Sequence, residues 1–169
     1  MKKIIATILC LLSFSISAEE KNYSISADIG RANGNIDGYR LGLQTEFTSW
    51  LHGHDIPLSG YIEGSLNYWN GSGDESYAIA VAPVFVLPLC NNCNYTPYVE
   101  AGIGIAFISE KKIDDRDLSS SFQFENRVGV GIKTKEIDFH VRYMHYSNGS
   151  TSQPNDGLDL FLAGMAFKF

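Results

Sequence analysis

The sequence predicts an all-β protein, an eight-stranded antiparallel transmembrane β-barrel of the outer membrane. Segments of alternating apolar and polar residues recur along the chain between turn residues, and a two-residue period is that of a strand. The polar side of nearly every segment carries charges of both signs, which can pair inside a closed barrel. Phe, Tyr and Gly are abundant, with 10, 9 and 16 copies, which suits strands and turns better than helices.

The first eighteen residues predict a secretory signal peptide. Lys2 and Lys3 precede an apolar run over residues 4–14, and small residues lead to a cleavage position after Ala18. A membrane-anchoring helix is the alternative, but the run is short for a hydrocarbon layer of about 30 Å. We therefore expect residues 1–18 to be removed and residues 19–169 to form one barrel domain.

Eight strands are expected in the mature chain, and an even number closes a barrel without leaving an unpaired edge in lipid. With both termini in the periplasm, the loops near 32–36, 70–74, 109–119 and 148–156 are extracellular. The turns near 51–58, 88–94 and 133–135 are then periplasmic. The expected strands cover residues 23–31, 37–50, 59–69, 75–87, 95–108, 120–133, 135–147 and 157–169.

The alternation also predicts which face each residue occupies. In the sixth expected strand Phe124 and Val128 share one face, while Glu125 and Arg127 share the other. We expect the charged face inside and the apolar face against lipid, since a soluble lipocalin-like barrel would reverse this pattern. The aromatic last residue, Phe169, resembles the end of bacterial outer-membrane barrels. Small residues fall on the interior side, as a narrow barrel needs: Gly42, Ala78, Ala80, Ala82, Gly102, Gly104, Gly129 and Gly131.

Two cysteines remain after the signal peptide, Cys90 and Cys93, separated by two asparagines between two expected strands. In an exported protein this spacing favours a local disulfide across a turn. Free thiols are one alternative, and redox or metal chemistry is another, although no βαβ pattern surrounds the pair.

Charge and composition bear on the partners. The net charge of −6 provides no basic surface for nucleic acid, so none is expected as a partner. His52, His54 and Asp55 could bind a metal, but a polar periplasmic turn is the favoured interpretation. No metal and no cofactor is expected.

The last two expected strands hold the candidate chemistry. By parity His145 and Ser147 both face lipid at the outer end of one strand, and Asp159 faces lipid at the outer end of the next. If the hairpin places Asp159 opposite His145, strands about 4.8 Å apart bring the carboxylate to the imidazole. The imidazole can then take the serine proton as the hydroxyl attacks an ester. Asp156 is the alternative acid, although it has the opposite parity.

This region resembles the lipid A 3-O-deacylases, the PagL-like acyloxyacyl hydrolase family. The matching segments are His145-Tyr146-Ser147-Asn148 and Gln153-Pro154-Asn155-Asp156-Gly157. The resemblance implies that His145 is the general base and Ser147 the nucleophile, with Asn155 and Asn148 helping to stabilise the oxyanion or to position the substrate. The usual acid of the family is a glutamate, where this chain has Asp159. A family glycine has no sure counterpart, since Gly149 is only nearby.

The resemblance also implies the substrate and the location. The substrate would be lipopolysaccharide in the outer leaflet of a Gram-negative bacterium, and the reaction would hydrolyse the ester-linked acyl chain at position 3 of lipid A. Outer-membrane lipid would surround the barrel, and a homodimer is left open. Two other functions compete: a lipid acyltransferase with an interior acyl pocket, and a non-enzymatic structural or adhesion barrel.

Overall fold

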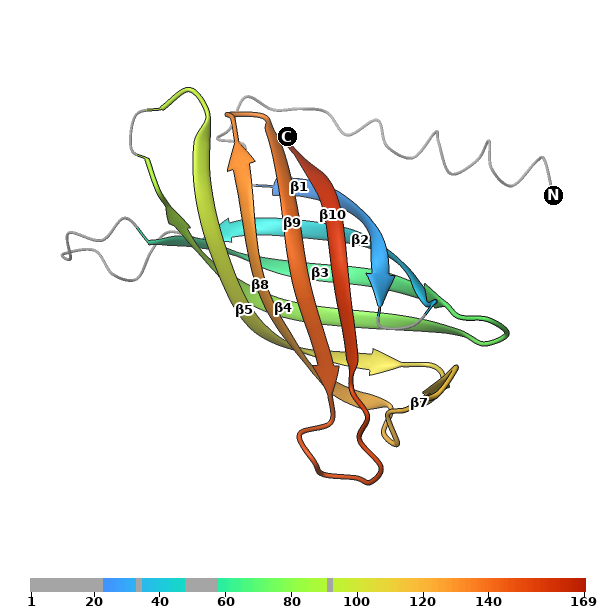
Figure 1. The fold of residues 1–169 in the computed structure, drawn as a ribbon. Helices are drawn as coiled ribbons and strands as arrows, with labels where there is room; N and C mark the ends of the chain where they lie inside the picture. Colours follow the sequence, from blue (N-terminus) through green and yellow to red (C-terminus); the bar gives the residue numbers. More distant parts are fainter. Residues whose placement is uncertain (1–22, 33–34, 48–57, 91–92) are drawn as a thin grey trace.

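The protein is described by a computed structural model that covers residues 23–32, 35–47, 58–90 and 93–169. Eight antiparallel strands form a closed barrel in the order β1-β10-β9-β8-β5-β4-β3-β2 (Figure 1). No helix among these residues is long and apolar enough to cross a membrane. The barrel strands are β1 (Tyr23–Ala32), β2 (Asp37–Phe47), β3 (Ser59–Asn70), β4 (Glu75–Pro88), β5 (Thr96–Ile108), β8 (Phe122–Lys133), β9 (Ile137–Ser147) and β10 (Leu158–Lys168).

The predicted eight-stranded barrel is confirmed, and one element was not predicted. Two short strands, β6 (Lys112–Ile113) and β7 (Arg116–Asp117), pair as a small hairpin in the connection between β5 and β8. This segment was expected to be an extracellular loop, because a two-residue strand is too short to show a period. The predicted signal peptide and the turn with His52, His54 and Asp55 lie outside the described residues.

The two ends of the barrel differ. The last residue, Phe169, donates a backbone hydrogen bond to Tyr23, so the start of β1 and the end of β10 lie at one end. The opposite end, called the outer end below, carries the β9–β10 connection and the β6–β7 hairpin (Figure 1). This arrangement fits the predicted topology, in which these connections are extracellular.

The alternation sorts side chains as predicted. Along β9, Val141 faces outward and is half exposed, whereas the neighbouring Arg142 is buried. An apolar outward face is what a hydrocarbon surrounding requires. Similar exposed apolar side chains surround the barrel, among them Leu41, Leu43, Leu66, Ile79, Val130 and Phe161.

Ion pairs fill the middle of the interior. The Arg40 guanidinium contacts Glu63 at 2.6 Å and Glu125 at 3.0 Å, and Arg127 contacts the same two carboxylates at 2.7 and 2.8 Å. All four side chains are almost completely buried. Buried charges are tolerated only when each finds a partner of opposite sign, and this network supplies one. The predicted pairing of interior charges is confirmed.

A second set of charges lies nearer the end that carries the chain terminus. Arg142 binds Glu100 at 2.7 Å and Asp28 at 3.1 Å. The buried His140 places Nε2 at 2.7 Å from Asp28 and Nδ1 at 2.9 Å from Asp138. Both ring nitrogens of this histidine are therefore occupied by the interior network.

Apolar side chains close the outer end of the interior. Trp69 and Tyr146 pack edge to face with their ring centroids 4.8 Å apart. Ile113 and Leu118, from the β6–β7 hairpin and the residue after it, are fully buried in the same cluster. The hairpin thus covers the outer opening of the barrel. The predicted polar interior begins below this apolar layer. The remaining members include Ile36, Met144, Leu158, Leu160 and Leu162.

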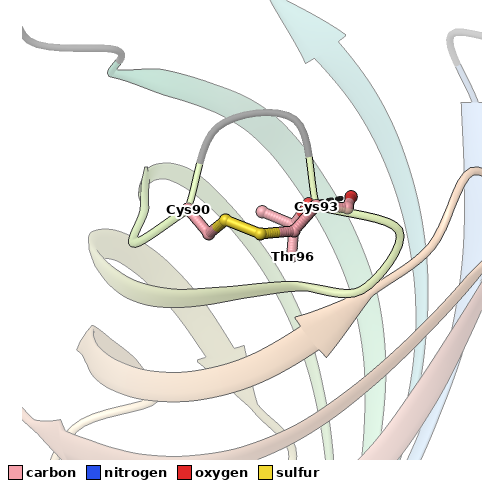
Figure 2. The surroundings of a disulfide bond; sticks show 3 residues. All are labelled: Cys90, Cys93 and Thr96. Carbon is pink, nitrogen blue, oxygen red and sulfur yellow. Dashed lines mark hydrogen bonds between the residues drawn. A yellow bond between two sulfur atoms is a disulfide. The ribbon is translucent and has the colours of Figure 1, made fainter.

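The predicted disulfide is confirmed. Cys90 and Cys93 are joined across the connection between β4 and β5, and Thr96 donates a 3.4 Å hydrogen bond to the carbonyl of Cys93 (Figure 2). This connection lies at the end opposite the outer loops. The bond closes a loop of only a few residues, so its effect on stability through chain entropy is small.

Candidate active site

Strand parity places the candidate residues on the outward face at the outer end. In β9 the buried Met144 and Tyr146 alternate with the partly exposed His145 and Ser147. In β10, Asp159 lies between the buried Leu158 and Leu160. The three polar side chains therefore point away from the barrel interior, as the alternation predicted.

The register of the β9–β10 hairpin brings the acid to the histidine. Asp159 lies directly opposite His145, and Asp159 Oδ1 is 2.6 Å from His145 Nδ1. Their side chains are 24% and 36% exposed, so water screens this pair only in part. With Nδ1 bonded to the carboxylate, Nε2 carries the lone pair that can accept a proton. This is the tautomer that a general base needs.

Ser147 lies two residues after His145 on the same face. Successive outward positions of a strand are about 7 Å apart, within the combined reach of an imidazole and a hydroxyl. Within the described parts of the chain, the Ser147 hydroxyl forms no hydrogen bond with the ring. Catalytic hydrogen bonds are often long before substrate is bound, so a ring rotation on binding could complete the contact.

The two candidate asparagines lie differently. The Asn148 side chain is fully buried on the interior side, where its amide nitrogen donates to the carbonyls of Leu118 at 2.9 Å and Ser152 at 3.1 Å. Asn155 accepts a 3.2 Å hydrogen bond from the backbone N–H of Asn148 through its side-chain oxygen. Asn148 was expected to help stabilise the oxyanion or to position the substrate, and its buried side chain holds the loop that carries Asn155.

Two glycines shape the loop next to the histidine. Gly157 has a φ of +67°, and a Cβ added to it would lie 3.1 Å from Cε1 of His145. Gly149 has a φ of +63°, and a Cβ there would lie 3.0 Å from the ring of Phe124. Glycine adopts this left-handed backbone without steric cost. At both positions it also avoids crowding an aromatic ring.

The β6–β7 hairpin supports this loop from a distant part of the sequence. The backbone N–H of Asp117 donates to Asp156 Oδ2 at 2.7 Å, and the backbone N–H of Asp156 donates to the Asp117 carbonyl at 3.2 Å. Arg116 donates to the Asp156 carbonyl at 3.3 Å. Asp156, the alternative acid, is thus engaged by the hairpin, and His145 contacts Asp159 instead.

Sequence reasoning missed two outward-facing neighbours of His145. Tyr143 donates a 2.6 Å hydrogen bond to Asp159 Oδ1. Asn126 of β8 lies directly opposite His145, and its side chain forms no hydrogen bond with any described residue. Parity alone could have identified both, because each is polar at a position predicted to face lipid.

The comparison with protein-family models completes this description. Residues 37–168 match the model of lipid A 3-O-deacylase (PagL). The chain belongs to the PagL family. The match includes β9, β10 and the loop between them, so the outward His145–Asp159 pair lies within the family's common region.

Individual relatives agree with this membership. The chain is 36% identical over 167 residues to the lipid A deacylase PagL of Pseudomonas aeruginosa, covering 95% of both chains. It is also 36% identical over 73 residues to the lipid A deacylase PagL of Bordetella bronchiseptica, covering 43% of this chain and 41% of that one.

Solved structures show the same architecture. The crystal structure of the outer membrane enzyme PagL superimposes with a TM-score of 0.80 at 34% identity, over 86% of this chain and 99% of that one. A designed transmembrane β-barrel, at 13% identity and a TM-score of 0.57, shares the fold alone; it covers 91% of this chain and 100% of the design. This PagL-family chain is an outer-membrane barrel.

Proposed function

We propose that this chain is a lipid A 3-O-deacylase, which hydrolyses the ester-linked acyl chain at position 3 of lipid A in outer-leaflet lipopolysaccharide. The observation that carries the proposal is the 2.6 Å contact between His145 and Asp159 on the lipid-facing side of the outer end, with Ser147 two residues away on the same face. Polar groups are costly against hydrocarbon, so a matched set at this depth calls for a function. Membership of the PagL family supplies the substrate class.

The proposed mechanism is that of a serine esterase. Ser147 Oγ attacks the ester carbonyl carbon while His145 Nε2 takes the hydroxyl proton, and Asp159 stabilises the imidazolium that forms. His145 then returns the proton to the departing sugar oxygen, which leaves an acyl group on Ser147. A water molecule, deprotonated by His145, then attacks the acyl carbonyl carbon, and His145 returns the proton to Ser147 Oγ as the fatty acid leaves.

Asn155 is the proposed oxyanion donor. Its side-chain oxygen is held by the Asn148 backbone, which leaves the Nδ2 hydrogens as the donors. Donors fixed before the reaction stabilise a developing negative charge without reorganisation. Asn148 is a positioning residue in this proposal, because it anchors the loop that carries Asn155.

The interior gives little support to an acyltransferase with an acyl pocket inside the barrel. Ion pairs occupy the middle, and packed apolar side chains occupy the outer end. An open cavity of about 510 Å³ lies at the opposite end, and charges of both signs line it, among them Lys133, Lys135, Glu46 and Glu136. Such a charged cavity, on the periplasmic side of the predicted topology, is unsuited to an acyl chain.

The test is the mass spectrum of lipid A from cells that express the wild-type chain or Ser147→Ala. Deacylation predicts loss of one acyl chain with the wild type and an unchanged spectrum with the variant. A gain of mass by one acyl chain would indicate an acyltransferase. An unchanged spectrum with a folded wild-type barrel would favour a non-enzymatic role.

A further inference from the structure

The outward face of β9 carries a polar side chain that the proposed mechanism does not use. The Tyr143 hydroxyl donates to Asp159 Oδ1 at 2.6 Å, and the same oxygen accepts from His145 Nδ1 at 2.6 Å. A carboxylate oxygen has lone pairs for two donors, and both distances are those of strong hydrogen bonds to a charged group. Tyr143, Asp159 and His145 therefore form one connected unit centred on a single oxygen.

The surroundings of Tyr143 fix its hydroxyl. Its ring packs against Phe161, its cross-strand neighbour in β10, with the ring centroids 5.2 Å apart. Tyr143 lies two residues before His145 on the same face of β9, and it is further from the outer end of the barrel. Hydrocarbon at that depth supplies no donor for a carboxylate, so the phenol is the donor available on that side.

We infer that Tyr143 is a positioning residue: it holds the Asp159 carboxylate against His145 and shares its negative charge. An aspartate carboxyl rotates in a broad torsional well, so each donor that bonds to it narrows its orientation. The second donor fixes the oxygen that both partners use. The effect on catalysis rests on the proposed function, but the coupling of the three side chains does not.

Two other groups lie near the unit. Asn126 lies opposite His145 from β8 and is uncharged. Arg116 of β7 adds a favourable positive charge near Asp159. Arg116 itself pairs with Asp115 at 3.7 Å and donates a hydrogen bond to the Asp156 carbonyl. Tyr143 donates to the same Asp159 oxygen that His145 contacts.

The test uses Tyr143→Phe, which removes one oxygen atom and keeps the ring that packs on Phe161. We expect kcat on lipopolysaccharide to fall about tenfold with KM changed less than about twofold, because Tyr143 acts through Asp159 and not on the substrate. The acidic limb of the kcat/KM profile should move to higher pH by roughly half a unit or more. Without the Tyr143 hydrogen bond, the Asp159 carboxylate keeps its full negative charge toward His145 and favours the protonated imidazole. If Tyr143 only packed against lipid, Tyr143→Phe would change neither kcat nor the acidic limb of the pH profile.

Two variants serve as controls. Tyr39→Phe removes a hydroxyl from another outward tyrosine, on β2 away from the site, and should leave kcat and the pH profile unchanged. The double variant Tyr143→Phe with Asp159→Ala should be no slower than Asp159→Ala alone, because the hydroxyl acts through the side chain of Asp159 and has nothing to hold once that side chain is removed. An additive loss would contradict the coupling. If Tyr143→Phe fails to fold, Tyr143→Leu replaces it in the same measurements.

A spectroscopic measurement separates this inference from the proposed function. The His145 Nδ1 proton, held by a short bond to a carboxylate, should give a downfield proton resonance in the detergent-solubilised barrel, identified by its loss in His145→Asn. In Tyr143→Phe this resonance should move or disappear, whereas in Tyr39→Phe it should stay. That result together with no deacylation by the wild type would refute the proposed function and retain the coupling. An unchanged resonance in Tyr143→Phe would overturn the coupling, whether or not the wild type is active.

Discussion

Replacing Asp159 with asparagine removes the charge that the imidazolium needs and preserves the shape of the side chain. The contact between Asp159 Oδ1 and His145 Nδ1 is 2.6 Å. Opposite unit charges at that distance attract by about 6 kcal/mol at an effective dielectric constant of about 20. Both side chains are partly exposed, so solvent screening reduces this attraction energy to about 3 kcal/mol. If all of it stabilises the transition state, kcat should fall roughly 100- to 200-fold.

The orientation of the new amide decides whether the loss is larger. An amide that turned its nitrogen toward His145 would force the wrong tautomer, which in a comparable triad costs about 10⁴-fold. Here Tyr143 donates to the same oxygen and favours the orientation in which the amide oxygen faces both donors. We therefore expect Asp159→Asn to stay near the smaller loss, and Asp159→Glu, which keeps the charge, to retain a substantial part of the activity.

The assay is deacylation of lipopolysaccharide by purified, folded barrels, with folding checked by heat-modifiable gel mobility. Asp156→Asn is the matched control, because Asp156 contacts the hairpin and not the histidine. Its activity should stay within a few-fold of the wild type. Wild-type turnover by Asp159→Asn together with an inactive Asp156→Asn would refute the assignment of the acid.

Three further predictions concern other parts of the molecule. His145→Asn should lower turnover by orders of magnitude, whereas His140→Asn, in the interior network, should affect stability in urea more than turnover of the folded protein; the reverse order would show that the wrong histidine was assigned. Gly157→Ala should reduce kcat in a barrel that still folds, because the left-handed backbone is strained by about 1 kcal/mol and the methyl group presses on the His145 ring; an unaffected kcat would mean that the loop adapts freely. Replacing Cys90 and Cys93 with serine should preserve deacylation, since the disulfide lies at the other end of the barrel, and a folded but inactive double variant would contradict its local role.

Much of the fold follows from the sequence because a barrel wall in lipid obeys one rule. Each outward residue faces hydrocarbon and each inward residue faces the interior, so parity in β9 alone separates His140 from His145 and predicts which of them is buried. The same rule predicted the outward position of Asp159. The hairpin register then placed it opposite His145, as expected.

The parts that the sequence did not predict depend on contacts between distant segments. The β6–β7 hairpin is held by Asp156 and by burial of Ile113 and Leu118 in the outer opening of the barrel, and no local period reveals such contacts. The motif indicated that Asn148 helps to stabilise the oxyanion or to position the substrate, but its contacts with Leu118 and Ser152 could not be predicted. Parity marks Tyr143 as an outward-facing polar residue, but its bond to Asp159 depends on how the two strands are paired.

The products that purified wild-type and Ser147→Ala barrels release from lipopolysaccharide distinguish a serine-dependent 3-O-deacylase from the alternatives. Tandem mass spectrometry of the lipid A identifies both the acyl chain that is lost and the position that it leaves. We expect the wild type to release the chain at position 3 and Ser147→Ala to release none, with both proteins folded. Equal release by Ser147→Ala, or loss from another position by the wild type, would contradict this expectation.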